Sequence, residues 1–162
     1  MNRYAEHKGN DHRSEFLSVR LGEQEFAIDI KSIREIRGWI ASTNLPFAPA
    51  FIKGMINLRG SVLVVVDLAQ RLGFAATKLD AASVVVVVEC GDRTVGLLVD
   101  AVCDIITVTD EMRQNTPETG SDMPKSFIEG LVMMDNRIIS ILSLPVLVPD
   151  ENVQRMAELA AA

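Results

Sequence analysis

Residues 49–68 read PAFIKGMINLRGSVLVVVDL. A proline precedes an FIKG motif, a short apolar strand, a turn and a second apolar strand that ends at Asp67. The same order returns from Pro124, where an FIEG motif leads into another strand, turn and strand. Upstream, the Gly22 turn and the strand after it match the Gly91 turn and its following strand. Two matched blocks in the same order indicate an internal duplication, which decides the fold.

The duplication indicates an all-β fold of two pseudo-symmetric repeat units, at about residues 15–68 and 83–144. We expect each unit to close into a small five-stranded barrel, because closure removes exposed strand edges. A short helical piece is expected at Asp67–Leu72. Runs of β-branched residues or of alternating polarity predict strands at Phe16–Leu21, Glu25–Ile30, Val62–Val66, Val84–Glu89, Thr94–Val99 and Ile138–Leu142.

A valine run indicates where the two units meet. Val84–Val88 does not alternate in polarity, so we expect it to be buried on both faces, between the packed barrels. The two barrels are then intertwined parts of one domain, residues 15–149. A single continuous meander with coincidental similarity between its halves is the alternative.

The two ends of the chain differ from this β-rich centre. Residues 1–14 are polar and aperiodic, which predicts a flexible tail. Residues 150–162 are rich in helix formers with an apolar face, which predicts a C-terminal amphipathic helix. No apolar signal core begins the sequence, and no apolar run approaches the roughly 18 residues of a membrane span. We therefore expect a cytoplasmic protein without direct membrane insertion.

The composition offers few groups for catalysis. A net charge of −6 argues against nucleic-acid binding, which needs a basic face. Both histidines, His7 and His12, lie in the N-terminal tail, so no internal histidine is available as a general base or metal ligand. Cys90 and Cys103 lack metal-site spacing and are expected to be reduced, part-buried packing residues. We expect a non-enzymatic protein with no catalytic residue, metal or cofactor.

Charged residues at two places suggest surface recognition instead. The segment SIREIRG at Ser32–Gly38 sets Glu35 among arginines and apolar residues, and Arg59 stands beside a turn glycine from which a guanidinium projects. We hypothesise that Glu35 and Arg59 pair on one face. An exposed ion pair contributes only about 0–1 kcal/mol to stability, so its use would be to offer charged groups to a partner. A solvated loop charge and an ordinary turn residue remain the alternative.

Three blocks of this sequence resemble motifs of the CheW family. They are AIDIKSIREIRG at 27–38, PAFIKGMINLRG at 49–60 followed by VVVDL at 64–68, and VGLLVDAV at 95–102. The resemblance covers roughly residues 15–148. It implies two SH3-like five-stranded barrels and an adaptor that joins chemoreceptor cytoplasmic tips to the regulatory domain of the histidine kinase CheA, at the periphery of membrane receptor arrays.

The resemblance also implies a receptor-binding surface. Glu35 and Arg59 match the family's charged pair, and other matched positions are apolar or small and line a groove between the barrels. Such a groove suits the helical tip of a receptor. The expected receptor-binding residues are Ile33, Glu35, Ile36, Arg37, Gly54, Arg59, Val102 and Ile105.

The kinase-binding residues stay unassigned, because the polar connection Thr109–Met123 lacks an aromatic anchor. Two alternatives to the chemotaxis adaptor remain. One is a related adaptor in another CheA-like pathway, such as pilus motility or development. The other is a small-ligand-binding β-barrel, which would need a polar cluster inside an apolar pocket.

Overall fold

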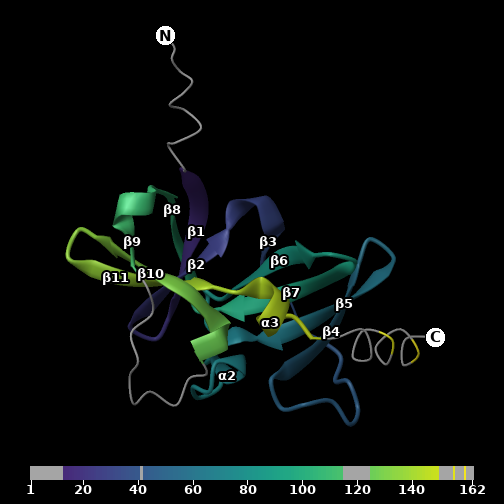
Figure 1. Ribbon diagram of the computed structural model, residues 1–162. Coiled ribbons are helices and arrows are strands. Elements are labelled where there is room, and N and C mark those ends of the chain that lie inside the picture. The colour runs from purple at the N-terminus through teal and green to yellow at the C-terminus, as the bar shows by residue number, and fades with distance from the viewer. Residues whose placement is uncertain (1–12, 41, 115–124, 150–154, 156–158, 160–162) are drawn as a thin grey trace.

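The computed structural model describes residues 13–40, 42–114, 125–149, 155 and 159, which form two β-sheets beside each other (Figure 1). All six strands expected from the sequence are present. The first sheet contains β1 (Ser14–Leu21), β2 (Gln24–Asp29), β8 (Ala101–Val108), β9 (Arg113–Gln114), β10 (Ile128–Met134) and β11 (Arg137–Leu142). The second contains β3 (Ile33–Gly38), β4 (Ile52–Leu58), β5 (Ser61–Asp67), β6 (Val84–Cys90) and β7 (Arg93–Val99).

Short helical pieces follow some of these strands. The expected one is α2 (Leu68–Arg71), and its counterpart in the second unit is α3 (Leu144–Leu147). Among the described residues, single turns of 3-10 helix form η1 (Ile30–Ser32), η2 (Asp110–Met112) and η3 (Lys125–Phe127).

Each sheet combines strands from both repeat units. The strand order is β8-β1-β2-β11-β10-β9 in the first sheet and β3-β6-β7-β5-β4 in the second. Each strand of the run β8-β1-β2-β11-β10 has a counterpart at the equivalent place in the other repeat unit. When every strand of this run is replaced by its counterpart, the order becomes β3-β6-β7-β5-β4, which is that of the second sheet. The pseudo-symmetric all-β fold is confirmed, but the expectation that each unit closes on itself is wrong.

The exchange follows from where the chain crosses between the sheets. It leaves the first sheet through η1, directly after β2, and returns at Asp100, between β7 and β8. The N–H of Asp100 donates to the Arg20 carbonyl at 3.1 Å, which ties the return point to β1. Parallel pairing of β2 with β11 and of β7 with β5 then joins the hairpin of one unit to that of the other.

The register of the strands repeats along with their order. Phe26 on β2 lies opposite Ser140 on β11, and Val95 on β7 lies opposite Val64 on β5. These are equivalent pairs, because the sequence repeat aligns Phe26 with Val95 and Val64 with Ser140. A matching register shift occurs in β3 against β6 and in β8 against β1. The duplication is therefore visible down to single residue pairs.

The valine run of β6 is buried on both faces, as the sequence predicted. Val86 and Val88 belong to a buried cluster that also takes Phe26 from the first sheet, and we call this cluster the shared core. Val85 and Val87 face the other way and pack with buried residues of the second sheet. The shared core therefore joins the two sheets.

Arg71, at the end of α2, also links the two repeat units. Its guanidinium carbon lies 4.5 Å from the ring centre of Phe51 and 5.0 Å from that of Phe127, which are equivalent residues of the repeat. It donates to the carbonyl oxygens of Val146 and Leu147 at 3.0 and 3.1 Å. Burial lowers the pKa of this guanidinium, which nevertheless stays charged at neutral pH. The cation thus holds α3 against α2.

The expected tail and C-terminal helix lie almost wholly outside the described residues. Of residues 1–14, Arg13 and Ser14 are described, and Ser14 begins β1. Of residues 150–162, Arg155 and Leu159 are described, and both are helical and exposed. Within the described ranges, no helix is long and apolar enough to cross a membrane.

The two cysteines are unpaired, but their burial differs from the expectation. Cys90 is half-buried beside the shared core. Cys103 is exposed on β8, so it is not the packing residue that the sequence predicted. It lies where β8 shifts register against β1, between Val102 and Ile105, and the side chains there are exposed.

Gly54→Ala is expected to lower the free energy of unfolding by about 1–3 kcal/mol. Gly54 has a φ of 153°, and a Cβ there would lie 2.6 Å from Ser42 Oγ and 2.7 Å from the Thr43 carbonyl oxygen. The backbone must therefore shift. Urea denaturation measures the change, and Gly38→Ala is the control because nothing lies within 4 Å of a Cβ at that position. Equal losses for both variants would contradict the steric explanation.

Candidate functional site

Two arginines meet one carboxylate beside β3, an edge strand of the second sheet. Arg59 Nη1 donates to Glu35 Oε2 at 2.6 Å, and Arg37 Nη1 donates to Glu35 Oε1 at 3.3 Å. The Glu35 side chain is 24% exposed, whereas that of Arg59 is 72% exposed. The hypothesised pairing of Glu35 with Arg59 is confirmed. We call these three residues the charged cluster.

The NLRG motif builds the turn that presents Arg59. Arg59 and Gly60, between β4 and β5, have φ values of 52° and 86°. Positive φ at both central residues is the pattern of turns that match the twist of a hairpin. Asn57 Oδ1 accepts the Gly60 N–H at 2.9 Å and fixes this geometry. The arginine side chain is thereby aimed across the sheet at Glu35.

The charged cluster sets how Glu35 titrates. The hydrogen bond from Arg59 holds the pKa of this carboxyl below its ordinary value of 4.5, because it outweighs the opposing effect of desolvation. The charge of Arg59 and the hydrogen bond from Arg37 lower the pKa further, each by less. Because the folded-state pKa is lowered, the pair is intact above pH 4.5 and is lost as pH falls through the lowered value. The Glu35 carboxyl is therefore ionised at neutral pH.

Arg59→Gln is expected to raise the pKa of Glu35 toward its ordinary value. The substitution removes the hydrogen bond and the charge that stabilise the carboxylate. NMR titration of the Glu35 carboxyl carbon measures the midpoint. Arg34→Gln is the matched control, because Arg34 pairs with Glu89 instead. A Glu35 midpoint that stays fixed in Arg59→Gln, or moves equally in both variants, would contradict this account.

A bulge in β3 divides the expected receptor-binding residues between two faces. Ile33 and Ile36 pair with Val88 and Val86, whereas Glu35 pairs with Val87, because the register shifts between Ile33 and Glu35. Residues directly opposite each other share a face of the sheet. The isoleucines therefore face the side of the shared core, and Glu35 faces the other side.

The equivalent strand β8 repeats the apolar part of this arrangement. Val102 and Ile105 pair with Val19 and Leu17, both members of the shared core. Ile33 and Val102 are half-buried against that core, while Ile36 and Ile105 are 46% and 61% exposed. Each edge strand thus carries an apolar pair that runs from the shared core to the surface.

Gly54 differs from the other expected site residues. It is buried on β4, where Ser42 and Thr43 approach its backbone. The structure therefore brings Glu35, Arg37 and Arg59 together and gives the four apolar residues a common relation to the shared core. A glycine at position 54 is explained by the close approach of Ser42 and Thr43, which leaves no room for a Cβ.

Comparison with known proteins identifies the family. A family model described as a CheW-like domain matches residues 15–152. The chain belongs to this family. A probable chemotaxis protein CheW of Rhizobium etli is 46% identical over 144 residues, which cover 89% of this chain and 93% of that protein. The chemotaxis protein CheW of Rhizobium meliloti is 44% identical over 151 residues, covering 93% and 97%.

A solved structure agrees with this assignment. The crystal structure of the scaffolding protein TtCheW from Thermoanaerobacter tengcongensis matches this CheW-family chain with a TM-score of 0.78 and 29% identity. The match covers 85% of this chain and 94% of that one. The expected family membership is confirmed, and the family is one of scaffold proteins.

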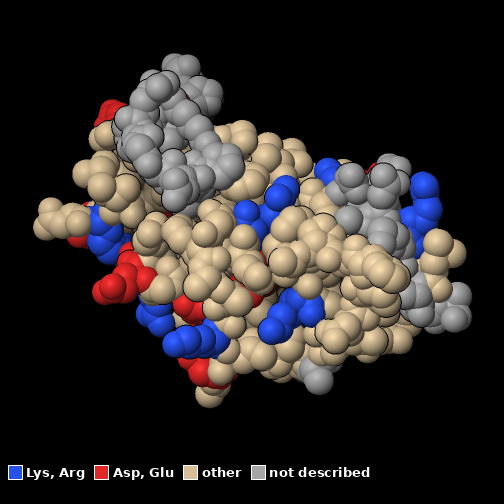
Figure 2. Space-filling view, turned by 90° about the horizontal axis from the view of Figure 1, so that it is seen from below, with Lys and Arg blue, Asp and Glu red and all other residues tan. Residues whose placement is uncertain are grey.

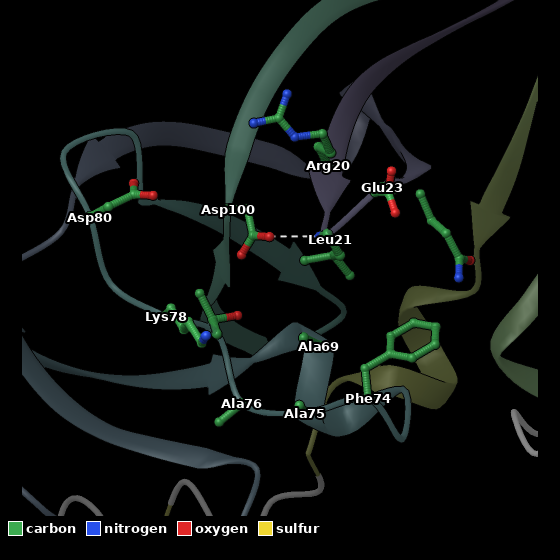
Figure 3. Close-up of a pocket in the computed structure, with 13 residues that line it drawn as sticks. Arg20, Leu21, Glu23, Ala69, Phe74, Ala75, Ala76, Lys78, Asp80 and Asp100 are labelled. Atoms are coloured by element: carbon green, nitrogen blue, oxygen red, sulfur yellow. Dashed lines mark hydrogen bonds between the residues drawn. The ribbon is translucent and has the colours of Figure 1, made fainter.

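Sequence reasoning missed a cavity next to α2, which we call the α2 cavity (Figure 3). It has a volume of about 500 Å³ and lies between the β1–β2 turn and the segment 73–80. Asp100 accepts the Gly22 N–H at 2.6 Å at its edge. Among the described residues, no three His, Cys, Asp or Glu side chains gather in a way that could hold a metal ion.

A buried carboxylate fixes one wall of the α2 cavity. Asp67 is fully buried and accepts the Thr77 N–H and hydroxyl, each at 2.9 Å, and the Gln70 N–H at 3.3 Å. Asp67 belongs to the VVVDL motif, but it holds the cavity wall only because Thr77, from a later loop, donates to its carboxylate. No signal in the sequence paired the two residues.

Proposed function

We propose that this CheW-family chain is a chemotaxis adaptor that couples chemoreceptor tips to the histidine kinase CheA. The charged cluster is the observation that carries the proposal. Its residues stand at the motif positions of the family's charged pair, and Arg59 is mostly exposed. An exposed ion pair adds little to stability, so a contact with a partner explains its presence better than folding does.

The proposed receptor surface runs along the edge strands β3 and β8. A helical receptor tip would place apolar side chains against the exposed ends of the apolar pairs, in the groove between the sheets. Because β3 is an edge strand, a partner that covers its edge can reach the isoleucines on one face and Glu35 on the other. The proposed contact residues are Ile33, Glu35, Ile36, Arg37, Arg59, Val102 and Ile105. Gly54 is buried, so its proposed part in this surface is to let the segment at Ser42 and Thr43 pack closely on β4.

The proposed mechanism needs no covalent chemistry. The adaptor would bind the receptor through this surface and the regulatory domain of CheA through another part of the sheets. A conformational change in the receptor would then shift the activity of the kinase only if the two receptor states bind the adaptor with different affinities. The size of that difference in affinity limits the size of the shift. The protein would act in the cytoplasm, peripheral to receptor arrays, as a non-enzymatic scaffold.

Titration of the chain with a CheA regulatory domain and a receptor cytoplasmic tip from the same cell tests the proposal. Binding of each partner alone, and of both together in a ternary complex, would support it. Binding of the kinase domain without any chemotaxis receptor would instead favour a related adaptor in another signalling pathway. Binding of neither partner would favour the alternative of a small-ligand-binding β-barrel.

A further inference from the structure

Phe47 presents a fully exposed aromatic ring. Its relative exposure is 99%, and its φ of 61° lies in the left-handed region, which bulky residues rarely adopt. The residue belongs to a run from Trp39 to Ile52 without a charged side chain, although 23% of the chain is charged. An exposed ring on a strained backbone lowers stability, and such strain concentrates at contact sites. These features point to a second molecule that covers the ring.

The loop that carries Phe47 is held in place on both sides. This Phe47 loop, residues 42–51, leads into β4 in Figure 1. Thr43 and Met55 exchange two backbone hydrogen bonds of 2.8 Å, and the Ile52 N–H donates to the Pro49 carbonyl at 3.0 Å. Leu45 is buried against Met55. An ordered loop loses little conformational freedom when it binds, so the ring is preorganised as an anchor.

The α2 cavity on the same chain has an apolar interior that suits such a ring. Leu21 and Ala69 are buried at its base. Phe74 is half-buried and packs on the core, while Ala75 and Ala76 form an exposed wall (Figure 3). A cavity of about 150 Å³ is enough to hold benzene. The α2 cavity of about 500 Å³ therefore has room for a phenylalanine ring and its neighbours.

We propose that Phe47 of one copy of this chain inserts into the α2 cavity of a second copy. The ring would cover the apolar base, with Pro46 and Ala48 against the alanine wall. Burial of the phenylalanine side chain removes its apolar surface from water, which stabilises such a contact. Each copy carries both a loop and a cavity, so the contact can recur from copy to copy.

The charges around the cavity favour an uncharged occupant. Charged residues of both signs line it, so a guest of either sign would meet a like charge; they are Arg20, Glu23, Lys78, Asp80 and Asp100. The Phe47 loop has no charge and leaves these groups in water. Figure 2 shows the face of the molecule seen from below, where acidic side chains gather at left while Lys and Arg side chains are spread over the face. The uncharged loop therefore complements the apolar base of the cavity.

Sedimentation velocity of the full chain over a range of concentrations tests this proposal. The average mass is expected to rise with concentration. Phe47→Asn should lower the association constant at least about 30-fold, as loss of an aromatic anchor typically does. Asparagine accepts the left-handed conformation, so the fold is retained. The matched control is Ile138→Asn, which removes another exposed apolar side chain and should leave association unchanged.

A mixing experiment separates the loop from the cavity. Ala75→Glu puts a carboxylate into the cavity wall at an exposed position, and it should block association as well, whereas Ala81→Glu outside the cavity should not. The Phe47→Asn copy keeps its cavity, and the Ala75→Glu copy keeps its loop. Each is therefore expected to be monomeric alone, and an equal mixture of the two is expected to form a one-to-one dimer.

Three results would overturn the proposal. They are a wild-type chain that stays monomeric at all concentrations, association that survives Phe47→Asn, and a mixture of the two variants that remains monomeric. Melting temperatures of all variants confirm that each is folded. Neither a receptor nor a kinase takes part, so this inference stands or fails independently of the proposed coupling role.

Discussion

Asp67→Ala is expected to lower the free energy of unfolding by about 3 kcal/mol. Asp67 is fully buried, and its carboxylate accepts two hydrogen bonds from Thr77 and one from Gln70. Removing the carboxylate leaves the buried Thr77 N–H and hydroxyl without an acceptor, and each unpaired buried donor costs about 1–3 kcal/mol. For a chain of 162 residues, this corresponds to a fall in melting temperature of about 6–12 °C.

Calorimetry and urea denaturation of a small series measure this effect. Asp67→Asn keeps the shape but turns one acceptor into a donor, so its loss is expected to lie between those of wild type and Asp67→Ala. Asp92→Ala, at an exposed turn position, is the control and should change stability by no more than about 0.5 kcal/mol. Faster amide exchange of Thr77 in Asp67→Ala would locate the loss at the cavity wall. Equal melting temperatures for Asp67→Ala and Asp92→Ala would contradict this explanation.

The sequence predicted the repeat and the ion pair because both are visible in local patterns. A glycine turn, a two-residue alternation and an FIKG or FIEG motif mark equivalent positions whatever lies next to them. The pairing of strands across the two units was not predictable in this way. Alternation shows which face of a strand is buried but not which strand lies beside it, so the exchange between the sheets had to come from the structure.

The same limit explains the residues that the sequence did not reveal. Asp67 accepts hydrogen bonds from Thr77 of a later loop, a pairing that no local pattern marks. Arg71 likewise contacts Phe51 and Phe127, which only the fold brings to it. The bulge in β3 likewise moves Glu35 to the face opposite Ile33 and Ile36. Simple alternation along a strand would have put Ile33 and Glu35 on the same face.

Reversing either charge of the Glu35–Arg59 pair is expected to weaken receptor binding about 30-fold or more and to leave folding almost unchanged. Glu35→Lys places a third cation beside Arg37 and Arg59, and Arg59→Glu puts two carboxylates together. Truncating or reversing one partner of an interfacial charge pair typically costs at least 2 kcal/mol of binding. The Arg59 side chain is 72% exposed, so solvent screens the repulsion in the unbound protein.

The double variant Glu35→Lys with Arg59→Glu separates the two roles that this pair can have. It restores the ion pair with reversed polarity, so any intramolecular effect should disappear. If a receptor contacts the charges directly, binding should stay weak in the double variant; if the pair only fixes the turn, binding should recover. Arg34 lies next to Glu35 on β3 and pairs with Glu89 of β6. Arg34→Glu breaks that neighbouring pair and is the matched control. Titration of each variant with a receptor tip measures its receptor affinity, and a thermal scan measures its melting temperature. A melting temperature that falls by more than about 10 °C in either single variant would show that the pair is structural instead.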